Sequence, residues 1–553
     1  MTKPRLHAGK LPGPRLDRPI PLWMIYPVIF AALYASHFTL LRLPYYWDEA
    51  GYYIPAAWDF FRTGSLIPIS TLTNAHPPLP SVYLALWWWA SGFLPEVTRE
   101  AVVVVAAFGL LAVWRLALRL SGVVSVAFWT VLLTALYPVW FAQSTLAHAD
   151  IFAAACALWG LVYTLPERGR NPWAAALWFA AAALSKETSI VLPLALAAFA
   201  FFLAFRGPRL GQESRSQRRH ALVESAWLVA SILPLACWYL YHRVKTGFLF
   251  GNPEFLRYNA QANLSPLRFL AAFGHRLLHL TAHMNLFVPV AIALAAFLLA
   301  PRPDLFGNER ARLERLPILR IYLLLAADAV FFSILGGALL TRYLLPMFPL
   351  VLLLAVMNLY RRVPRWQALA AVSAAGFVLG LFINPPYGFA PEDNLAYARF
   401  IRLHQEGIHQ LQQRYPDSTV LSAWPLTDEL SKPELGYVKQ PFDVAPIDDF
   451  SRAQVDLAAQ QPGRYSTALV FSTKFDPPTQ IFTLGTRSRA FDEQYFGLHH
   501  DLSPEQIAIE LHGSLVWKRE DHGLWIALIR FDRQLDAKLV FLPSLFPVAG
   551  EGK

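Results

Sequence analysis

The chain has 553 residues, of which 55% are hydrophobic and 16% charged, and it carries a formal net charge of +10. Apolar runs recur down to about residue 384, which excludes a soluble globular protein and predicts a polytopic α-helical membrane protein. Arginines concentrate in the breaks between these runs, where orientation in the membrane and contact with anionic lipid explain them, so we expect membrane lipid and no nucleic acid as a partner.

The first predicted element is a spanning helix over residues 22–41, a run of twenty residues without a charged side chain. Residues 1–21 are basic and should stay in the cytoplasm by the positive-inside rule. No small-residue cleavage site follows, so we interpret the run as an uncleaved anchor. Asp48 and Glu49 therefore emerge on the opposite face, in an external loop over residues 43–100.

The remaining spans follow from the positions of arginine. Breaks at 206–220, 302–315 and 361–365 are rich in arginine, and we place them in the cytoplasm. The run 79–94 is short for a span, carries three tryptophans, and is expected to lie on the outer face. About 11 transmembrane helices are predicted, at residues 22–41, 101–118, 123–141, 151–165, 173–184, 188–205, 222–242, 277–300, 317–336, 340–359 and 367–384.

The composition changes near residue 386, where long apolar runs give way to charged residues, turns and short alternating segments. We expect a transmembrane domain over 22–385 and a soluble periplasmic α/β domain over 386–553. In the second domain we predict a helix at 392–415 and strands at 418–424, 467–473, 514–520 and 524–531.

Five short motifs lie at or near the predicted outer surface: WDEAGYY at 47–53, HPPL at 76–79, AHAD at 147–150, LSKET at 184–188 and TRYLLPMFP at 341–349. Their order resembles the GT-C membrane glycosyltransferases, in particular the family of protein O-mannosyltransferases and lipid A aminoarabinose transferases. The resemblance covers roughly the first 350 residues. It implies a GT-C fold, a polyprenyl-phosphate-linked sugar as donor, and an acceptor hydroxyl on a protein, lipid or glycan.

Sugar transfer to a hydroxyl needs a base, and Asp48 is the candidate because a carboxylate beside a second carboxylate in a membrane cleft becomes more basic. Glu49 is expected to support it, or to hold the acceptor and the loop. The alternative is that both acids cap a helix predicted at 50–61. Asp150 is the third catalytic candidate and would orient the acceptor or hold a cation; its alternative role is to cap the helix that begins at Ile151.

The departing phosphate needs positive charge and hydrogen-bond donors, for which His76, Lys186, Arg342 and Tyr343 are the candidates. His76 begins HPPL, where the aminoarabinose transferases carry Lys. Lys186 would alternatively snorkel or pair with Glu187. Arg342 interrupts an apolar stretch, where a charge requires a buried partner. Tyr343 could donate a hydrogen bond to the phosphate, or serve as an aromatic at the membrane interface.

Three histidines recur every four residues, at His275, His279 and His283. Imidazoles one helical turn apart can chelate zinc or manganese. Polar capping of a buried helix is the alternative, and Ala75 stands where the aminoarabinose transferases carry a metal-binding Glu. No cofactor is firmly predicted, and a divalent metal stays open.

We therefore expect an inverting hexosyl- or pentosyltransferase at the outer face of the cytoplasmic (inner) membrane. A flippase or transporter of lipid-linked sugar is the alternative, because isolated charges inside a multi-span bundle also suit a substrate pathway. Against a transporter, the sequence shows no internal repeat and no matched pair of broken helices. A catalytically silent scaffold is a third hypothesis.

Overall fold

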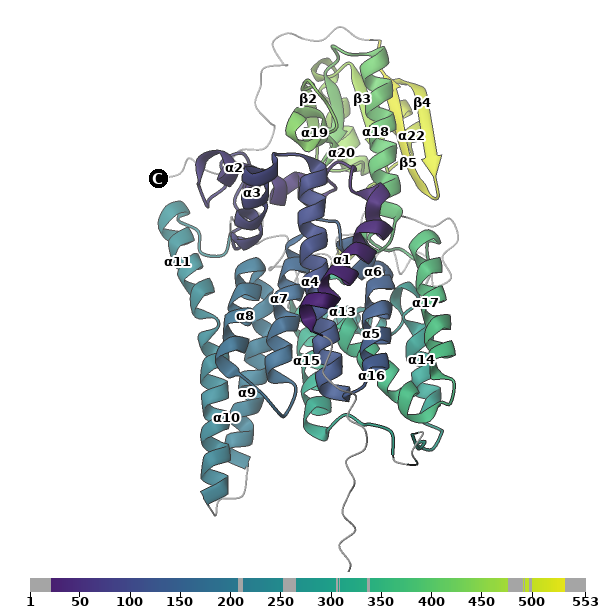
Figure 1. Ribbon diagram of the computed structural model, residues 1–553. Helices are drawn as coiled ribbons and strands as arrows, with labels where there is room; N and C mark the ends of the chain where they lie inside the picture. The colour runs from purple at the N-terminus through teal and green to yellow at the C-terminus, as the bar shows by residue number, and fades with distance from the viewer. Residues whose placement is uncertain are drawn as a thin grey trace, which may run out of the picture.

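The computed structural model describes residues 21–206, 212–251, 265–304, 307, 309–335, 339–475, 491, 493–496 and 500–532. The basic segment before residue 21 lies outside the described residues, as does the end of the chain after residue 532. In the described part, a bundle of apolar helices carries a small sheet-containing unit on one end (Figure 1).

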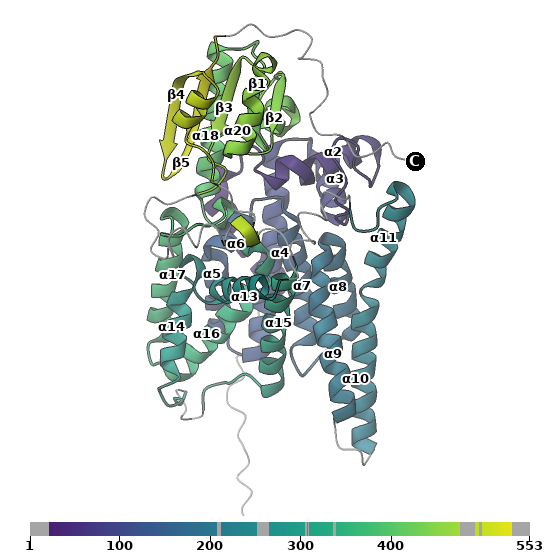
Figure 2. The same ribbon diagram turned by 180° about the vertical axis from the view of Figure 1, so that it is seen from behind.

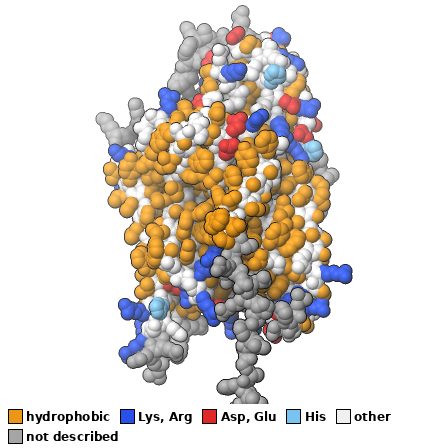
Figure 3. Space-filling view, in the orientation of Figure 1, with side chains coloured by type: hydrophobic (Ala, Val, Ile, Leu, Met, Phe, Trp, Pro, Cys, Tyr) orange, Lys and Arg blue, Asp and Glu red, His pale blue; other side chains and the backbone are white. Residues whose placement is uncertain are grey.

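Apolar helices form the bundle, and large hydrophobic side chains are exposed across its middle on the face shown in Figure 3. Such a belt suits a lipid environment, because exposing so large an apolar surface to water is unfavourable. The bundle helices are α1 (Leu22–His37), α4 (Pro95–Ser121), α5 (Val124–Leu136), α7 (Ala149–Thr164), α8 (Pro172–Ser185), α9 (Val191–Arg206), α10 (Gln212–Ala230), α11 (Leu233–Thr246), α13 (Pro266–Thr281), α14 (Phe287–Ala296), α15 (Arg315–Ile334), α16 (Phe348–Arg362) and α17 (Trp366–Phe382).

Five helices in the described residues are long and apolar enough to cross a membrane, or six when one bent pair counts as a span. Shorter apolar helices such as α5, α7, α8 and α17 stand beside them in the bundle (Figure 1). The count of eleven therefore stays a prediction. The order of the apolar helices nevertheless follows the predicted order along the chain.

Two predicted spans need correction. The span predicted at 277–300 is not one helix, because α13 and α14 meet at 99°. The break is a short 3-10 turn, η4 (His283–Asn285), and α13 lies across the bundle (Figure 2). The helix predicted at 222–242 begins much earlier, since α10 starts at Gln212 inside the segment expected to be a cytoplasmic break. Hydropathy alone fails here because polar helix ends extend beyond the apolar core.

The external loop folds against the end of the bundle that carries the small unit. A π-helical turn, η2 (Glu49–Tyr53), leads directly into α2 (Ile54–Thr63), which confirms the helix predicted at 50–61. The apolar run 79–94 forms α3 (Leu79–Ser91), which packs beside α2 and α4. This end of the molecule is called the loop end below.

The C-terminal unit is built on a five-stranded sheet in the order β2-β1-β3-β5-β4. β1 pairs in parallel with β2 and β3, while β5 pairs antiparallel with β3 and β4. The predicted helix and four strands are confirmed, and β2 was not predicted. The elements are α18 (Ala396–Arg414), β1 (Val420–Ala423), α19 (Leu426–Ser431), β2 (Val444–Ile447), α20 (Arg452–Ala459), β3 (Thr467–Phe471), α22 (Pro504–Glu510), β4 (Ser514–Asp521) and β5 (Leu524–Arg530).

The unit is packed onto the loop end rather than tethered beside it. Its hydrophobic core includes Tyr46 from the loop and Phe141 from α6 (Pro138–Gln143). Tyr437 also donates a hydrogen bond to the Tyr45 carbonyl at 2.9 Å. The loop that carries Asp48 is therefore held from both sides.

Candidate functional site

A cavity of about 2150 Å³ opens at the loop end, with walls from both the bundle and the C-terminal unit. Its polar lining includes most of the predicted site residues: Asp48, His76, Lys186, Arg342, Tyr343, His275, His279 and His283. Aromatic and aliphatic side chains of α11, α13 and α15 contribute to the remaining wall, together with the segment 379–391. Glu49 and Asp150 lie behind the cavity surface and do not line it.

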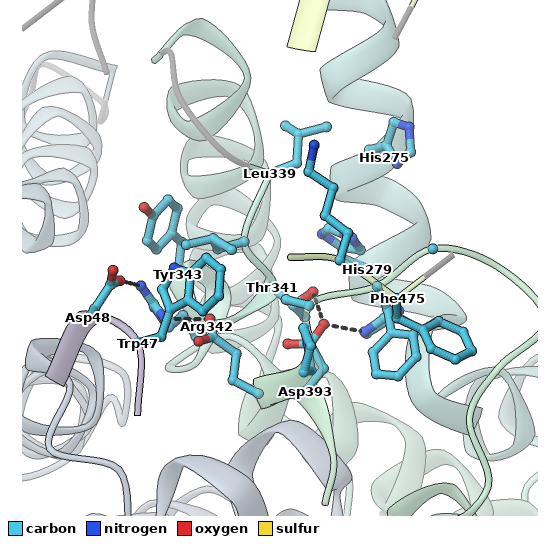
Figure 4. Close-up of a pocket in the computed structure, with 18 of the residues that line it drawn as sticks. Trp47, Asp48, His275, His279, Leu339, Thr341, Arg342, Tyr343, Asp393 and Phe475 are labelled. Atoms are coloured by element: carbon cyan, nitrogen blue, oxygen red, sulfur yellow. Dashed lines mark hydrogen bonds and ion pairs between the residues drawn. The ribbon is translucent and has the colours of Figure 1, made fainter. Parts of the chain in front are cut away.

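Arg342 is the centre of the polar cluster. It lies in η5 (Thr341–Leu344), between α15 and α16, and its side chain is only 3% exposed. The guanidinium pairs with Asp48 and Glu392, and its Nε lies 3.3 Å from an oxygen of Asp150. Figure 4 shows Asp48 and Arg342 facing each other across the cavity edge. A buried guanidinium requires such partners, as the sequence predicts.

Lys186 joins the same cluster through Asp150. Its ammonium lies 2.5 Å from Asp150 and 3.9 Å from the centre of the Tyr343 ring. The partner considered from the sequence, Glu187, instead lies 3.1 Å from His76. Asp150 therefore bridges two cations and fixes their separation.

The helix-capping alternatives for Asp48 and Asp150 do not hold. Asp48 occupies the residue before η2, but its side chain makes no capping hydrogen bond in the described structure. His148 occupies the corresponding position before α7, and the Asp150 carboxylate points instead to the cations. Both acids face charged side chains rather than free backbone amides.

Glu49 lies away from the cavity and is held by a buried network. It is fully buried, and its oxygens lie 3.0 and 3.1 Å from the guanidinium of Arg99. It also accepts hydrogen bonds from the backbone amides of Ala147, at 2.6 Å, and Tyr46, at 2.8 Å. Its charge is therefore paired with that of Arg99, and its effect on Asp48 stays a prediction. The contacts favour the other expectation, a carboxylate that holds the loop in place.

His76 reaches the cavity from the turn before α3. Its ring stacks on Tyr53 with centroids 5.7 Å apart, and Glu187 holds its Nδ1. The preceding residue, Ala75, has a φ of 59°, a conformation that is rare for residues other than glycine. Such strain persists only where the surrounding packing enforces it, and it fixes the direction of His76.

The three histidines line another part of the cavity wall. Their ring centroids are 6.3 Å apart for His275 and His279, and 5.1 Å apart for His279 and His283. His283 contacts Asp393 at 2.9 Å. Among the described residues, no group of three or more His, Cys, Asp or Glu side chains is placed to hold a metal ion.

Glu392 is a site residue that the sequence reasoning missed. It lies in η6 (Pro391–Asp393), in the linker between the last bundle helix and the C-terminal unit. Burial raises its pKa to about 8, although the charge of Arg342 acts in the opposite direction. Two adjacent acids following the last apolar run were the available signal, but nothing in sequence pairs them with Arg342.

No protein-family model matches the chain, and no curated protein matches it. Among solved structures, ArnT from Cupriavidus metallidurans matches with a TM-score of 0.54 and 15% identity, covering 92% of this chain and 98% of ArnT. ArnT bound to undecaprenyl phosphate matches with a TM-score of 0.54 and 16% identity over the same shares. An Archaeoglobus fulgidus oligosaccharyltransferase matches with a TM-score of 0.42 and 14% identity, covering 82% of this chain and 68% of that one. The likeness to ArnT shows that the chain has the GT-C fold, as predicted.

Proposed function

We propose, from the premise of the GT-C fold, that the chain is a glycosyltransferase using a polyprenyl-phosphate-linked sugar. The acceptor is a hydroxyl, and the reaction takes place at the outer face of the inner membrane. The observation that carries the proposal is the contact between Asp48 and Arg342 at the edge of a large, mostly apolar cavity. The capture of undecaprenyl phosphate by ArnT, a protein of the same fold, supports a lipid phosphate as the donor group.

When the donor binds, its phosphate displaces one of the carboxylates that contact Arg342. Asp48 is the partner that leaves, because its side chain is 33% exposed whereas those of Asp150 and Glu392 are nearly buried. An ion-paired carboxylate is a poor base, and the loss of its cation makes it a better one. The donor therefore activates the base that acts on the acceptor.

The transfer is a single displacement. The acceptor oxygen attacks the anomeric carbon from the face opposite the phosphate, the bond from that carbon to the phosphate oxygen breaks, and Asp48 takes the hydroxyl proton. Arg342 and Lys186 stabilise the charge that develops on the phosphate. One displacement inverts the anomeric configuration.

Lys186, Tyr343 and His76 complete the phosphate subsite in this proposal. All three line the cavity with Arg342, and apolar residues of α15, including Phe331 and Phe332, continue the wall away from them. A prenyl chain would lie along that apolar wall while its phosphate meets the cations.

The proposal is tested with purified protein in lipid vesicles supplied with undecaprenyl phosphate carrying a radiolabelled hexose, pentose or aminosugar. We expect the label to leave the lipid for an acceptor in an envelope extract. Movement of intact labelled lipid across the vesicle without transfer would support the flippase instead. Lys186→Met should weaken binding of undecaprenyl phosphate about 10- to 100-fold, since a hydrogen bond to a charged group contributes about 1.5–3 kcal/mol. Lys518→Met, on β4 and outside the cavity lining, is the matched control.

A further inference from the structure

A second polar cluster lies in the wall of the same cavity. Asp393 accepts hydrogen bonds from His283 Nε2 and from the Thr341 hydroxyl, each at 2.9 Å. With His283 as the neutral tautomer that donates from Nε2, its Nδ1 accepts from the Tyr387 hydroxyl at 3.1 Å. Tyr387 in turn accepts from the Met284 amide at 3.4 Å. The chain of donors has one consistent direction, from Met284 to Asp393.

This second cluster is rigidly joined to the first. Thr341 and Arg342 are neighbours in the chain, as are Glu392 and Asp393, and the two pairs contact each other residue by residue. Adjacent Cα atoms are about 3.8 Å apart, so the two clusters keep a fixed separation. Figure 4 shows Thr341 and Asp393 on one side of Arg342 and Asp48 on the other.

The backbone marks the second cluster in the same way as the first. Six residues other than glycine have positive φ in the described chain, and four of them border the two clusters. Trp47 precedes Asp48, and Ala75 precedes His76, with φ of 44° and 59°. Met284 and Asn285 follow His283, with φ of 47° and 66°. A strained backbone that is enforced by packing points to a positioned side chain.

The Tyr387 hydroxyl keeps accepting capacity toward the cavity. Oδ1 of Asp393 is buried and has no hydrogen-bond partner in the described structure, so this carboxylate acts on Tyr387 through His283 and not on a ligand. The Tyr387 oxygen accepts only from Met284, at the long distance given above, while its proton is committed to His283. A hydroxyl oxygen has two lone pairs, so it can accept a further hydrogen bond. The cluster therefore suits a ligand that donates.

The surroundings favour a neutral ligand with an apolar face. Phe389 and Phe475, whose ring centroids are 4.9 Å apart, line the same cavity as Tyr387, and so does Trp525. The described lining contains five Asp and Glu side chains, of which Glu392 has a pKa raised by burial, and three lysine and arginine side chains, so it offers no excess of positive charge for an anionic acceptor beside the donor phosphate. Aromatic rings with a few fixed polar groups are what a saccharide ring needs.

We propose that Tyr387, held by His283 and Asp393, forms the acceptor subsite and binds a hydroxyl of a neutral saccharide. Tyr387 touches the acceptor, whereas His283 and Asp393 are positioning residues that orient the Tyr387 hydroxyl. The assignment of this subsite to the acceptor rests on the proposed function, whereas the binding of a saccharide there does not. The acceptor is held at the aromatic wall, and its reacting hydroxyl extends toward Asp48.

Saturation-transfer NMR on the full chain in nanodiscs tests this subsite, with methyl α-D-glucopyranoside as the probe. We expect binding to the wild type and about fivefold weaker binding to Tyr387→Phe, the loss of one hydrogen bond. Tyr322→Phe is the matched control, because Tyr322 is exposed on the outer surface of α15. The affinity of Tyr387→Phe for undecaprenyl phosphate should equal that of the wild type.

The measurements distinguish an error in the subsite assignment from an error in the proposed function. Equal glycoside binding by Tyr387→Phe and wild type, or no binding to either, overturns the subsite. A serine- and threonine-rich peptide that binds through Tyr387 when the glycoside does not would overturn the saccharide assignment. Glycoside binding that depends on Tyr387, in a protein that ignores undecaprenyl phosphate, supports the subsite and contradicts the proposed function.

Discussion

Replacing Glu49 by alanine should destabilise the protein, whereas replacing its neighbour Asp48 should not. Glu49 is fully buried and satisfies Arg99 and two backbone amides, so Glu49→Ala leaves a buried guanidinium without its carboxylate. Breaking a buried pair in this way costs about 3–5 kcal/mol. Asp48 is partly exposed, and Arg342 keeps Asp150 and Glu392 when Asp48 becomes asparagine.

The expected change can be expressed as a melting temperature. Unfolding entropy is about 2.1 cal/mol/K per residue, so in a chain of this length each kcal/mol corresponds to about 1 °C. Glu49→Ala should therefore melt about 3–4 °C below the wild type in a thermal-shift assay on purified protein in detergent. Asp48→Asn should stay within about 1 °C.

A double variant separates charge from packing. Glu49→Leu combined with Arg99→Met removes both buried charges, and it should recover part of the loss seen in Glu49→Leu alone. Equal melting temperatures for Glu49→Ala and the wild type would refute the structural role of Glu49. So would a loss of the same size in Asp48→Asn.

Two further predictions concern the cavity edge. Affinity for undecaprenyl phosphate should fall as the pH rises through about 8, because Glu392 is neutral below its raised pKa and competes for Arg342 once ionised. Glu392→Gln should bind the lipid more tightly than the wild type at pH 9 and should lose this pH dependence. A pH profile of lipid affinity that is the same in Glu392→Gln and the wild type would contradict the prediction. Gly51→Leu should lower initial rates of transfer at least tenfold, since a Cβ there would lie 2.6 Å from the Trp424 ring, which also packs on Trp47 beside Asp48. Trp424→Ala in the same chain should restore part of the rate, and no recovery would argue against this contact.

The sequence predicts the elements whose signal is local. Long apolar runs identify α4 and α15, and alternating segments joined by a short turn identify the hairpin of β4 and β5. β2 escapes because it is a four-residue edge strand that contains Pro446, a residue that weakens any strand pattern. The break between α13 and α14 could not be predicted, because hydropathy does not report the direction of a helix axis. The apolar run continues through the 99° bend.

The same limit applies to the site. Topology brings Asp48, Lys186 and Arg342 to one face of the membrane, and that is enough to predict their meeting. The ion-pair partners of the site residues could not be predicted from the sequence, because pairing depends on side-chain packing between distant segments. Arg99 lies 50 residues from Glu49, and Glu392 lies 50 residues from Arg342, so no local pattern could assign these pairs.

The most direct test of Asp48 as the base compares transfer and lipid binding in Asp48→Asn. A general base contributes about 10²- to 10⁴-fold, so the rate of sugar transfer should fall by that factor. Binding of undecaprenyl phosphate should persist or tighten, because the phosphate no longer has to displace a carboxylate from Arg342. Asp417→Asn, an exposed aspartate of the C-terminal unit, is the control and should transfer at the wild-type rate. Transfer by Asp48→Asn at the wild-type rate would contradict the account.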